Sequence, residues 1–295
     1  MRVCLTSLAS SPHMPPGRKA GRQRSPRRTR PKERMRLIDT FFKSTCALAI
    51  CGFFTAGAID RTQDRGRRVL NEAVAALGGP QFLAMRDRVE TGWTSSWHGS
   101  KTRHVRTKIY TLYDESTPEI LERRAFDKDE SYGVVFNETG GYEVTWRGAR
   151  PLSEEKIADF REELARNIFH ILRHRLNDPG LIVEYRGADK CENQAADLVD
   201  ITDAENRVTT VCFSQATRLP IRQSYYRRNP VTKDRIEHVT IFSRYTEADG
   251  VVWPRMIQRL RDGDPVTAVV FETVSVNQSL SKDRFAIPEL ALTGR

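Results

Sequence analysis

The chain has 295 residues, of which 39% are hydrophobic, and a formal net charge of +10. The excess charge lies in residues 1–58, which hold 12 of the 48 basic and 2 of the 38 acidic residues, so the other 237 residues carry 36 of each. A neutral folded part offers no field that would attract nucleic acid, and we expect no nucleic-acid partner.

Residues 1–34 are rich in Arg, Pro and Ser and have no hydrophobic period. Such a composition cannot bury enough apolar surface to fold, which predicts a disordered leader. Met35 offers a second translation start, and from that start the leader would not be made. Both starts stay open.

A secretory signal peptide is predicted over residues 35–58. Its basic start is followed by the apolar run Cys46–Phe54, and Ala56 and Ala58 are the small residues that precede a cleavage site. The apolar run is short for a membrane span, and an uncleaved anchor is the alternative. Cleavage after Ala58 would export residues 59–295, a length that fits one domain, to the periplasm or the medium.

A short helix and five strands are predicted next. The segment Asp64–Leu77 has an apolar side and ends at Gly78-Gly79-Pro80, a helix-stop signal. The strands alternate as a half-buried sheet does: residues 88–98, 103–113, 118–126, 132–137 and 142–147. Residues 118–126 have charges on both faces, so we expect this strand near an edge of the sheet.

One long amphipathic helix is predicted from Ser153 to Asn177, with Ser153 as its N-cap. Its apolar residues recur at steps of three and four, the period of one buried face: Ile157, Phe160, Leu164, Ile168, Ile171, Leu172 and Leu176. Three basic side chains should point into water: Arg161, Arg166 and Arg173. Such a helix needs an apolar surface to cover, which the strands before and after it can supply.

Seven more strands follow the helix: residues 181–186, 195–202, 207–213, 220–227, 235–245, 251–261 and 265–276. Well-marked turns separate them, so about a dozen strands meander antiparallel. A sheet of this length must curl or close. The predicted fold class is α+β, a curved antiparallel β half-barrel with helices covering its concave face.

The order of these elements resembles the periplasmic lipoprotein-carrier (LolA/LolB-like) superfamily over about residues 65–290. The similarity lies in short segments near strand ends: Thr217–Arg222, Phe242–Tyr245, Asp249–Pro254, Val274–Asn277 and Phe285–Pro288. Ser214 departs from the pattern, because such proteins often have Asp at this strand end. The resemblance implies an exported half-barrel that shields a lipid, a lipoprotein acyl chain or another apolar ligand.

Catalytic arrangements are weak in this sequence. His170 and His174 share a helix face and could bind zinc, but no third ligand is identifiable, and Ile171 stands where a metalloprotease has Glu. Acidic residues early on the helix alternate with basic ones, which is typical of a solvated face. Nucleophile-elbow, phosphate-loop and dinucleotide patterns are not found. We therefore expect no enzyme activity, no catalytic or metal-binding residue and no cofactor.

Ligand contacts are expected from large side chains on the strands and from the apolar face of the helix: Trp93, Trp97, Ile109, Trp146, Phe160, Leu164, Ile168, Leu172 and Trp253. The four tryptophans fit a cavity wall and a packed core equally well. The first hypothesis is an exported protein that binds a lipid or other apolar ligand. The alternative is an envelope scaffold or accessory module with a filled core, which acts through contacts with envelope proteins. Peripheral contact with the membrane is compatible with both.

Two of the five cysteines, Cys191 and Cys212, fall in the exported part, where the compartment would allow a disulfide. The expected strand register places Cys212 opposite a residue near Leu198 rather than opposite Cys191, so a bond must form through the adjoining loop. A disulfide and two free thiols both stay open.

Overall fold

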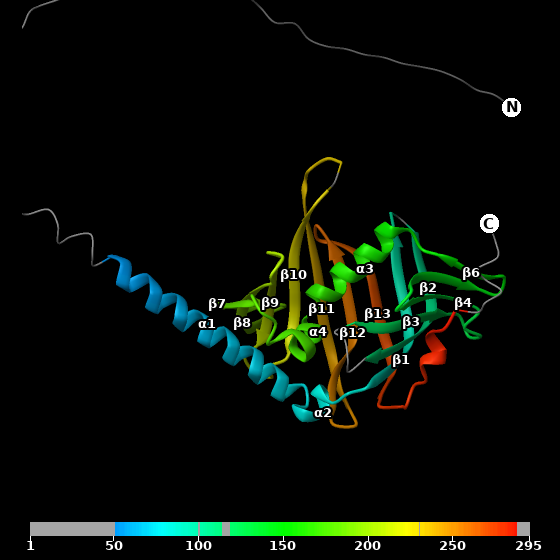
Figure 1. Ribbon diagram of the computed structural model, residues 1–295, viewed down its shortest axis with the longest axis horizontal. Coiled ribbons are helices and arrows are strands. Elements are labelled where there is room, and N and C mark those ends of the chain that lie inside the picture. Colours follow the sequence, from blue (N-terminus) through cyan, green and yellow to red (C-terminus); the bar gives the residue numbers. More distant parts are fainter. Residues whose placement is uncertain (1–50, 100, 114–118, 230, 288–295) are drawn as a thin grey trace, which may run out of the picture. The chain divides into compact units, whose positions relative to one another are not determined.

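The computed structural model describes residues 51–287, apart from residues 100, 114–118 and 230, and side chains from residue 61 onward. The predicted leader, residues 1–34, and most of the predicted signal peptide lie outside this range. Cleavage after Ala58 stays a prediction. Figure 1 shows a strongly curled sheet with a helix, α3 (Glu154–Arg166), lying across one face.

Thirteen strands of the described residues form one antiparallel sheet. Their bounds are β1 (Asp87–His98), β2 (Lys101–Tyr113), β3 (Ile120–Phe126), β4 (Tyr132–Asn137), β5 (Gly140–Thr145), β6 (Gly148–Pro151), β7 (Ile182–Cys191), β8 (Gln194–Thr202), β9 (Val208–Ser214), β10 (Pro220–Arg228), β11 (Arg235–Ala248), β12 (Val251–Arg261) and β13 (Asp264–Val276). All twelve predicted strands are present. The sequence does not predict β6, because it has only four residues and includes Gly148 and Pro151.

Two meanders meet in the middle of the sheet. The strand order is β6-β5-β4-β3-β2-β1-β13-β12-β11-β10-β9-β8-β7, so β1 pairs with β13, and β6 and β7 are the edges. The chain between β6 and β7 must therefore cross a face of the sheet from one edge to the other, and α3 lies on this crossing. The predicted α+β fold, a curved half-barrel with helices on its concave face, is confirmed.

Strand β3 lies inside the sheet, between β2 and β4, so the predicted edge position is wrong. Leu121 and Ala125 are buried on one face of the strand. On the other face, Glu122 and Arg124 pair with each other at 2.6 Å. The charges that suggested an edge belong instead to the concave face of an internal strand.

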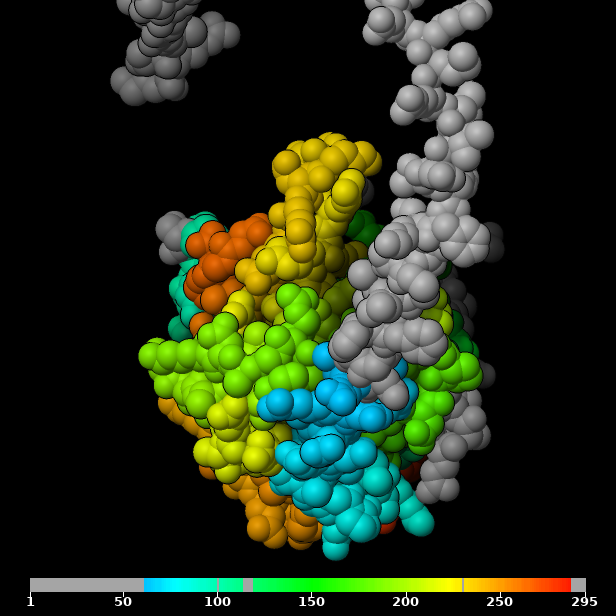
Figure 2. Space-filling view, turned by 90° about the vertical axis from the view of Figure 1, so that its left-hand side faces the viewer, coloured from blue at the N-terminus to red at the C-terminus, as the bar shows by residue number. Residues whose placement is uncertain are grey.

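Helix α1 (Cys51–Ala76) is longer than the predicted helix and packs along β7. At Gly66 the two backbones approach so closely that a Cβ would lie 2.9 Å from Val183 Cγ1 and 3.2 Å from the Tyr185 nitrogen. Only glycine permits this approach without displacement. A short helix, α2 (Pro80–Leu83), follows. Figure 2 views the molecule from the side that α1 covers.

The predicted single helix from Ser153 to Asn177 is broken. α3 ends at Arg166, Asn167 is extended (φ −65°, ψ 120°), and the chain continues as α4 (Ile168–His170) and a π-helical turn, η1 (Ile171–Arg175). Asn167 Oδ1 accepts hydrogen bonds from the backbone N–H groups of Phe169 and His170 at 2.9 and 3.3 Å. An Asn that caps a new helix competes with helix continuation, which the apolar period does not reveal. Ser153, the predicted N-cap, makes no side-chain cap hydrogen bond.

The main hydrophobic core lies where α1, α4 and η1 meet β7–β12, and its fully or nearly fully buried members include Leu70, Leu77, Phe82, Ile168, Leu172, Val199, Val211, Phe213 and Val251. A smaller cluster on the opposite face of the sheet packs under the 3₁₀ turn η2 (Lys282–Phe285): Tyr110, Leu121, Ala125, Val135 and Phe285. Among the described helices, none is long and apolar enough to cross a lipid bilayer.

A disulfide joins Cys191 at the end of β7 to Cys212 on β9, with the Cα atoms 6.5 Å apart. Cys212 pairs with Leu198 of the intervening strand β8, as the predicted register requires. The bond therefore ties an edge strand to the second strand inward.

Candidate functional site

A cavity of about 500 Å³ remains between the concave face of the sheet and helix α3. Strands β1–β4 form one side of its wall and β10–β13 the other, while α3 and α4 cover it. Its wall includes the aromatic side chains Tyr113, Phe126, Tyr132, Phe160, Phe169, Tyr225, Phe242, Trp253 and Phe271. The volume is in the usual range for a pocket that takes one small organic ligand.

The strand pattern explains which residues face the cavity. β2 turns alternate residues inward, as its period of two predicts: Val105, Thr107, Ile109, Thr111 and Tyr113. On β13 the alternation of side chains shifts at a β-bulge opposite Thr91 and Gly92. Thr91 pairs with Thr273 and Gly92 with Phe271, so Glu272 between them has no register partner on β1. A Cβ at Gly92 would lie 2.0 Å from the carbonyl oxygen of Val270, so glycine is required there. The bulge bends the sheet and leaves Phe271 in the cavity wall.

Helix α3 is the roof of the cavity. Phe160 and Leu164 line the cavity from above. The ring of Phe160 stacks on Phe136 with centroids 3.7 Å apart, and the guanidinium of Arg124 lies 5.8 Å from the Phe160 ring. The roof thus rests on aromatic and cationic groups of β3 and β4.

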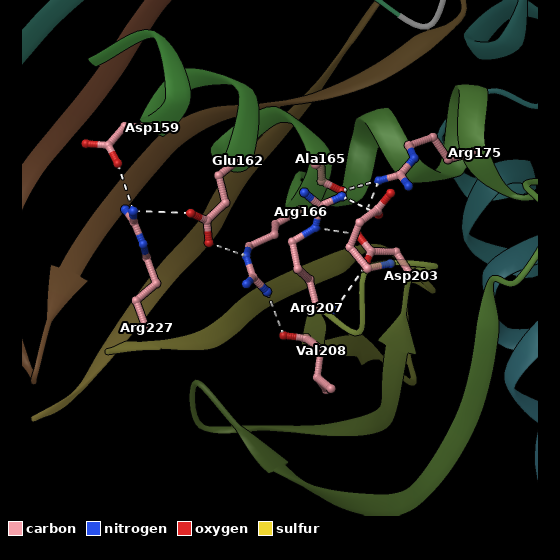
Figure 3. A network of polar contacts seen from close by, with 10 residues as sticks. Asp159, Glu162, Ala165, Arg166, Arg175, Asp203, Arg207, Val208 and Arg227 are labelled. Carbon is pink, nitrogen blue, oxygen red and sulfur yellow. Dashed lines mark hydrogen bonds and ion pairs between the residues drawn. The ribbon is translucent and has the colours of Figure 1, made fainter. Parts of the chain in front are cut away.

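Polar contacts fasten the other side of α3 to the sheet (Figure 3). Arg227 of β10 lies 2.8 Å from Asp159 and 3.2 Å from Glu162. Arg166 pairs with Glu162 at 3.1 Å and donates a hydrogen bond to the carbonyl oxygen of Val208 at 2.9 Å. The acidic residues of α3 that were expected to form a solvated face therefore serve partly to anchor the helix.

Two of the three arginines expected in water are held within the protein. Arg161 is exposed, as predicted. Arg166 is 7% exposed, and its guanidinium lies 4.6 Å from the Tyr225 ring. Arg173 donates to a backbone carbonyl of α2 at 2.6 Å and lies 4.3 Å from the Tyr113 ring. Long cationic side chains on a polar helix face reach partners that periodicity does not show.

A buried ion pair forms part of the cavity wall on β1. Arg88 Nε lies 3.0 Å from Glu90 Oε2, and both residues are buried. Arg88 also donates to the hydroxyl groups of Tyr113 and Thr111. The indole N–H of Trp253 donates to Glu90 Oε1 at 2.8 Å, and its ring lies 4.1 Å from the Arg88 guanidinium. The pair is charged, internally balanced and fixed by hydrogen bonds.

Burial alone would lower the pKa of Arg88, but the charge and hydrogen bonding of Glu90 contribute to a net rise of the pKa above its ordinary value. Burial raises the pKa of Tyr113, against the opposing effect of Arg88. Both side chains therefore hold their protons at neutral pH. The wall presents a guanidinium and a neutral phenol there.

The two histidines behind the cavity are neutral at pH 7. Burial, then the charge of His174 and of two neighbouring arginines, lowers the pKa of His170 to about 3. Burial and Arg173 lower the pKa of His174 to about 4. The rings lie 5.2 Å apart. In the part of the chain that the structure describes, no group of three or more His, Cys, Asp or Glu side chains is placed to hold a metal ion.

The structure brings four of the nine predicted ligand residues to the cavity wall: Ile109, Phe160, Leu164 and Trp253. Two others, Ile168 and Leu172, are fully buried in the main core. The remaining three, Trp93, Trp97 and Trp146, do not line the cavity. Trp93 and Trp97 lie on the opposite face of β1, because the alternate positions of that strand face inward, and Trp146 is 77% exposed. Ligand contact by the wall residues stays a prediction.

Sequence reasoning missed the charged part of the wall, whose described members are Arg88, Glu90, Arg103, Glu122, Arg124, Glu163 and Arg259. One feature of the sequence could have indicated it. The predicted strand at residues 118–126 has charges on both faces and is both preceded and followed by other predicted strands. Charged residues facing the inside of a sheet indicate a polar cavity when the strand is internal.

Searches by sequence found no matching family model and no matching curated protein. Comparison with solved structures found several similar folds. A DUF1329 family protein from Desulfovibrio piger has a TM-score of 0.53 at 15% identity, over 76% of this chain and 97% of its own. A putative outer membrane lipoprotein-sorting protein domain from Vibrio parahaemolyticus also has a TM-score of 0.53, at 12% identity and with the same coverage of both chains. The chain has a LolA-like fold. The predicted resemblance to that superfamily is confirmed at the level of the fold.

Proposed function

We propose that this protein is an exported, non-catalytic binding protein that holds a lipid or other largely apolar ligand in the cavity under α3. The observation that supports this most is the cavity itself. A volume of about 500 Å³ stays open beneath α3, although hydrophobic side chains could have filled it. A pocket of that size can hold a small ligand. Its described wall mixes aromatic and aliphatic side chains with a comparable number of polar and charged ones, which suits a ligand with both kinds of surface.

The ion pairs in the wall favour an amphiphile over a pure hydrocarbon. Thr107, Thr111 and the Arg88–Glu90 pair offer hydrogen-bonding atoms beside apolar surface. A ligand with an ester, amide or hydroxyl group near its apolar chain would satisfy both kinds of surface. A lipid or a lipoprotein acyl chain fits this description, and the similar fold from Vibrio parahaemolyticus is described as a putative lipoprotein-sorting domain.

We also propose an envelope location. The disulfide between Cys191 and Cys212 supports it, because such bonds persist in oxidising compartments. The predicted signal peptide supplies the route. Sequencing the N-terminus of the protein from an envelope fraction should give Ile59, and a cytoplasmic protein that begins at Met1 would contradict this part.

The binding test is mass spectrometry of lipid extracted from the natively purified protein. A cavity-filling variant, Ile109→Trp, should carry much less lipid than the wild type because the larger ring occupies the cavity. Trp146→Ala, which changes an exposed residue outside the cavity, is the matched control and should retain its lipid. Absence of lipid from the wild type, or equal retention in both variants, would contradict the proposal.

A second candidate, an accessory role through surface contacts, is favoured by two strongly exposed apolar side chains, Trp146 and Val231, at 77% and 84% exposure. Both residues lie in turns between strands, where they can reach an envelope protein or the membrane surface. Crosslinking in the envelope with wild type and with Trp146→Ala separates this role from ligand binding. A specific crosslinked product that disappears in the variant would support it.

A further inference from the structure

Among the described residues, the charged side chains that line the cavity are four arginines and three glutamates: Arg88, Arg103, Arg124, Arg259, Glu90, Glu122 and Glu163. Six of them form three pairs, at 3.0 Å for Arg88–Glu90, 2.6 Å for Arg124–Glu122 and 3.8 Å for Arg259–Glu163. Arg103 is the one left over: among the described residues, it makes no ion pair with an acidic side chain. The described part of the wall thus carries one uncompensated positive charge, at Arg103.

Arg103 lies at one end of the cavity rather than in its depth. It is near the start of β2, paired in register with Ser96 of β1 and close to the β1–β2 turn at His98. Its side chain is exposed, whereas Arg88 at the other end of the same wall is buried. Arg103 lines the cavity together with the aromatic residue Tyr132 of β4. Burial raises the pKa of Tyr132, and the charge of Arg103 opposes that rise.

The pairing decides where a ligand can carry charge. A charged group in the depth of the cavity would have no free counter-charge, because Arg88 and Arg124 already face carboxylates at 3.0 Å or less. Burying an unpaired charge there is strongly unfavourable. At the outer end, an anionic group meets Arg103 and stays partly in water, so it gains a partner at little desolvation cost.

We propose that the ligand is an amphiphile with a single anionic head group, which Arg103 binds at the end of the cavity near the β1–β2 turn while the uncharged chain lies under α3. This inference rests on the proposed ligand-binding function. A guanidinium recognises a carboxylate and a phosphate by the same two-pronged hydrogen bonding, so both head groups fit. Arg103 is then a specificity-determining residue that selects the head group and not the chain.

The test is competition against N-phenyl-1-naphthylamine, an uncharged fluorescent probe, bound to the full protein after delipidation. Three competitors with the same chain are compared: hexadecanoate, hexadecyl phosphate and hexadecanol. Both anions should displace the probe about fivefold more tightly than the alcohol at low salt, the magnitude expected of an ion pair that remains partly exposed. The advantage should shrink in 0.5 M NaCl. A difference between the two anions identifies which head group the site prefers.

Arg103→Gln should remove the preference for the anions and leave hexadecanol binding unchanged. Lys101→Gln is the matched control, because it removes an equal charge two residues away on the same strand from a side chain outside the cavity wall. Both positions are exposed, so both variants should fold, which circular dichroism checks. Equal affinity of the wild type for all three competitors would overturn this inference but not the proposed function. An equal loss of the preference for anions in both variants would have the same consequence. Failure of the probe and of every competitor to bind would overturn the proposed function together with it.

Discussion

The two halves of the segment that crosses the sheet share one hydrophobic period and have opposite surroundings. In α3, no apolar residue is fully buried, and ion pairs to β10 and β12 accompany the aromatic contacts beneath it. In α4 and η1, Ile168 and Leu172 are 0% exposed and belong to the main core. The break at Asn167 separates a helix that covers a cavity from one that completes a core.

This contrast shows that an amphipathic period tells which face of a helix is turned inward, but not whether that face meets packed atoms or open space. The sheet surface beneath the helix determines whether the helix face packs closely or borders a cavity. Under α4 and η1 the sheet presents Val199, Val211 and Phe213 and is covered by α1 as well. Under α3 it presents paired charges and threonines, which do not pack closely against an apolar face.

The largest difference between the two halves is expected when an apolar residue in each is replaced by Asp and the loss of unfolding free energy is compared. Ile168→Asp would bury a carboxylate in the core and should lower the free energy of unfolding by about 4 kcal/mol or prevent folding. Ile157→Asp, on the half-buried face of α3, should lower it by about 1 kcal/mol because water can reach the new charge. Urea unfolding followed by circular dichroism measures both. Equal losses would mean that α3 is packed as tightly as α4.

A milder pair of substitutions tests the cavity directly. Leu172→Ala creates a void in the core and should cost about 2–5 kcal/mol of unfolding free energy. Leu164→Ala only enlarges an existing cavity, so we expect a loss of about 1 kcal/mol together with a change in the lipid that the protein retains. Thermal melts with and without extracted lipid measure the two effects. A core-sized loss at Leu164 with no effect on bound lipid would favour the scaffold hypothesis.

The buried half should also be the pH-sensitive one. His170 has a folded pKa of about 3 against an ordinary value of 6.5, so the unfolded chain takes up a proton more readily than the folded protein. Stability is therefore complete above pH 6.5 and falls as the pH drops toward 3, by about 2 kcal/mol at pH 5. His170→Gln should reduce this dependence between pH 7 and 5 and leave the part that His174, with a folded pKa of about 4, contributes.

The control for this measurement is His104→Gln, which changes an exposed histidine on β2. It should leave the slope of stability against pH as it is in the wild type. An unchanged slope in His170→Gln would show that another group governs the loss at acid pH.

Most of the fold could be predicted from the sequence, because each strand carries its own alternation and each turn its own residues. The register that sets Cys212 opposite Leu198 followed from the hairpin alone. The pairing of β1 with β13 did not, since no local pattern reports on partners so far apart in the chain.

The site was harder to predict for the same physical reason. Ile109, Phe160 and Leu164 follow from periodicity, and they line the cavity. Which face of β1 is concave depends on the curvature of the whole sheet, so Trp93 and Trp97 were expected on the wrong side. The break at Asn167 depends on an amide of Gln223 that accepts the next backbone N–H, a contact between distant segments.

The smallest effect is expected where α3 is fastened by charge. Arg227 pairs with Asp159 and Glu162 while it remains about one-third exposed, so Arg227→Gln should change the free energy of global unfolding by less than about 1 kcal/mol. Local opening of α3 should respond more, because the helix loses two of the contacts that tie it to β10. Hydrogen exchange should therefore quicken across α3 and stay unchanged in η1, and 1 M NaCl should produce the same pattern in the wild type by screening beyond about 3 Å. Arg228→Gln, at an exposed neighbouring position outside this network, is the control. If exchange in η1 quickens as much as in α3, the two halves open as one unit and the distinction between a fastened cover and a packed core does not hold.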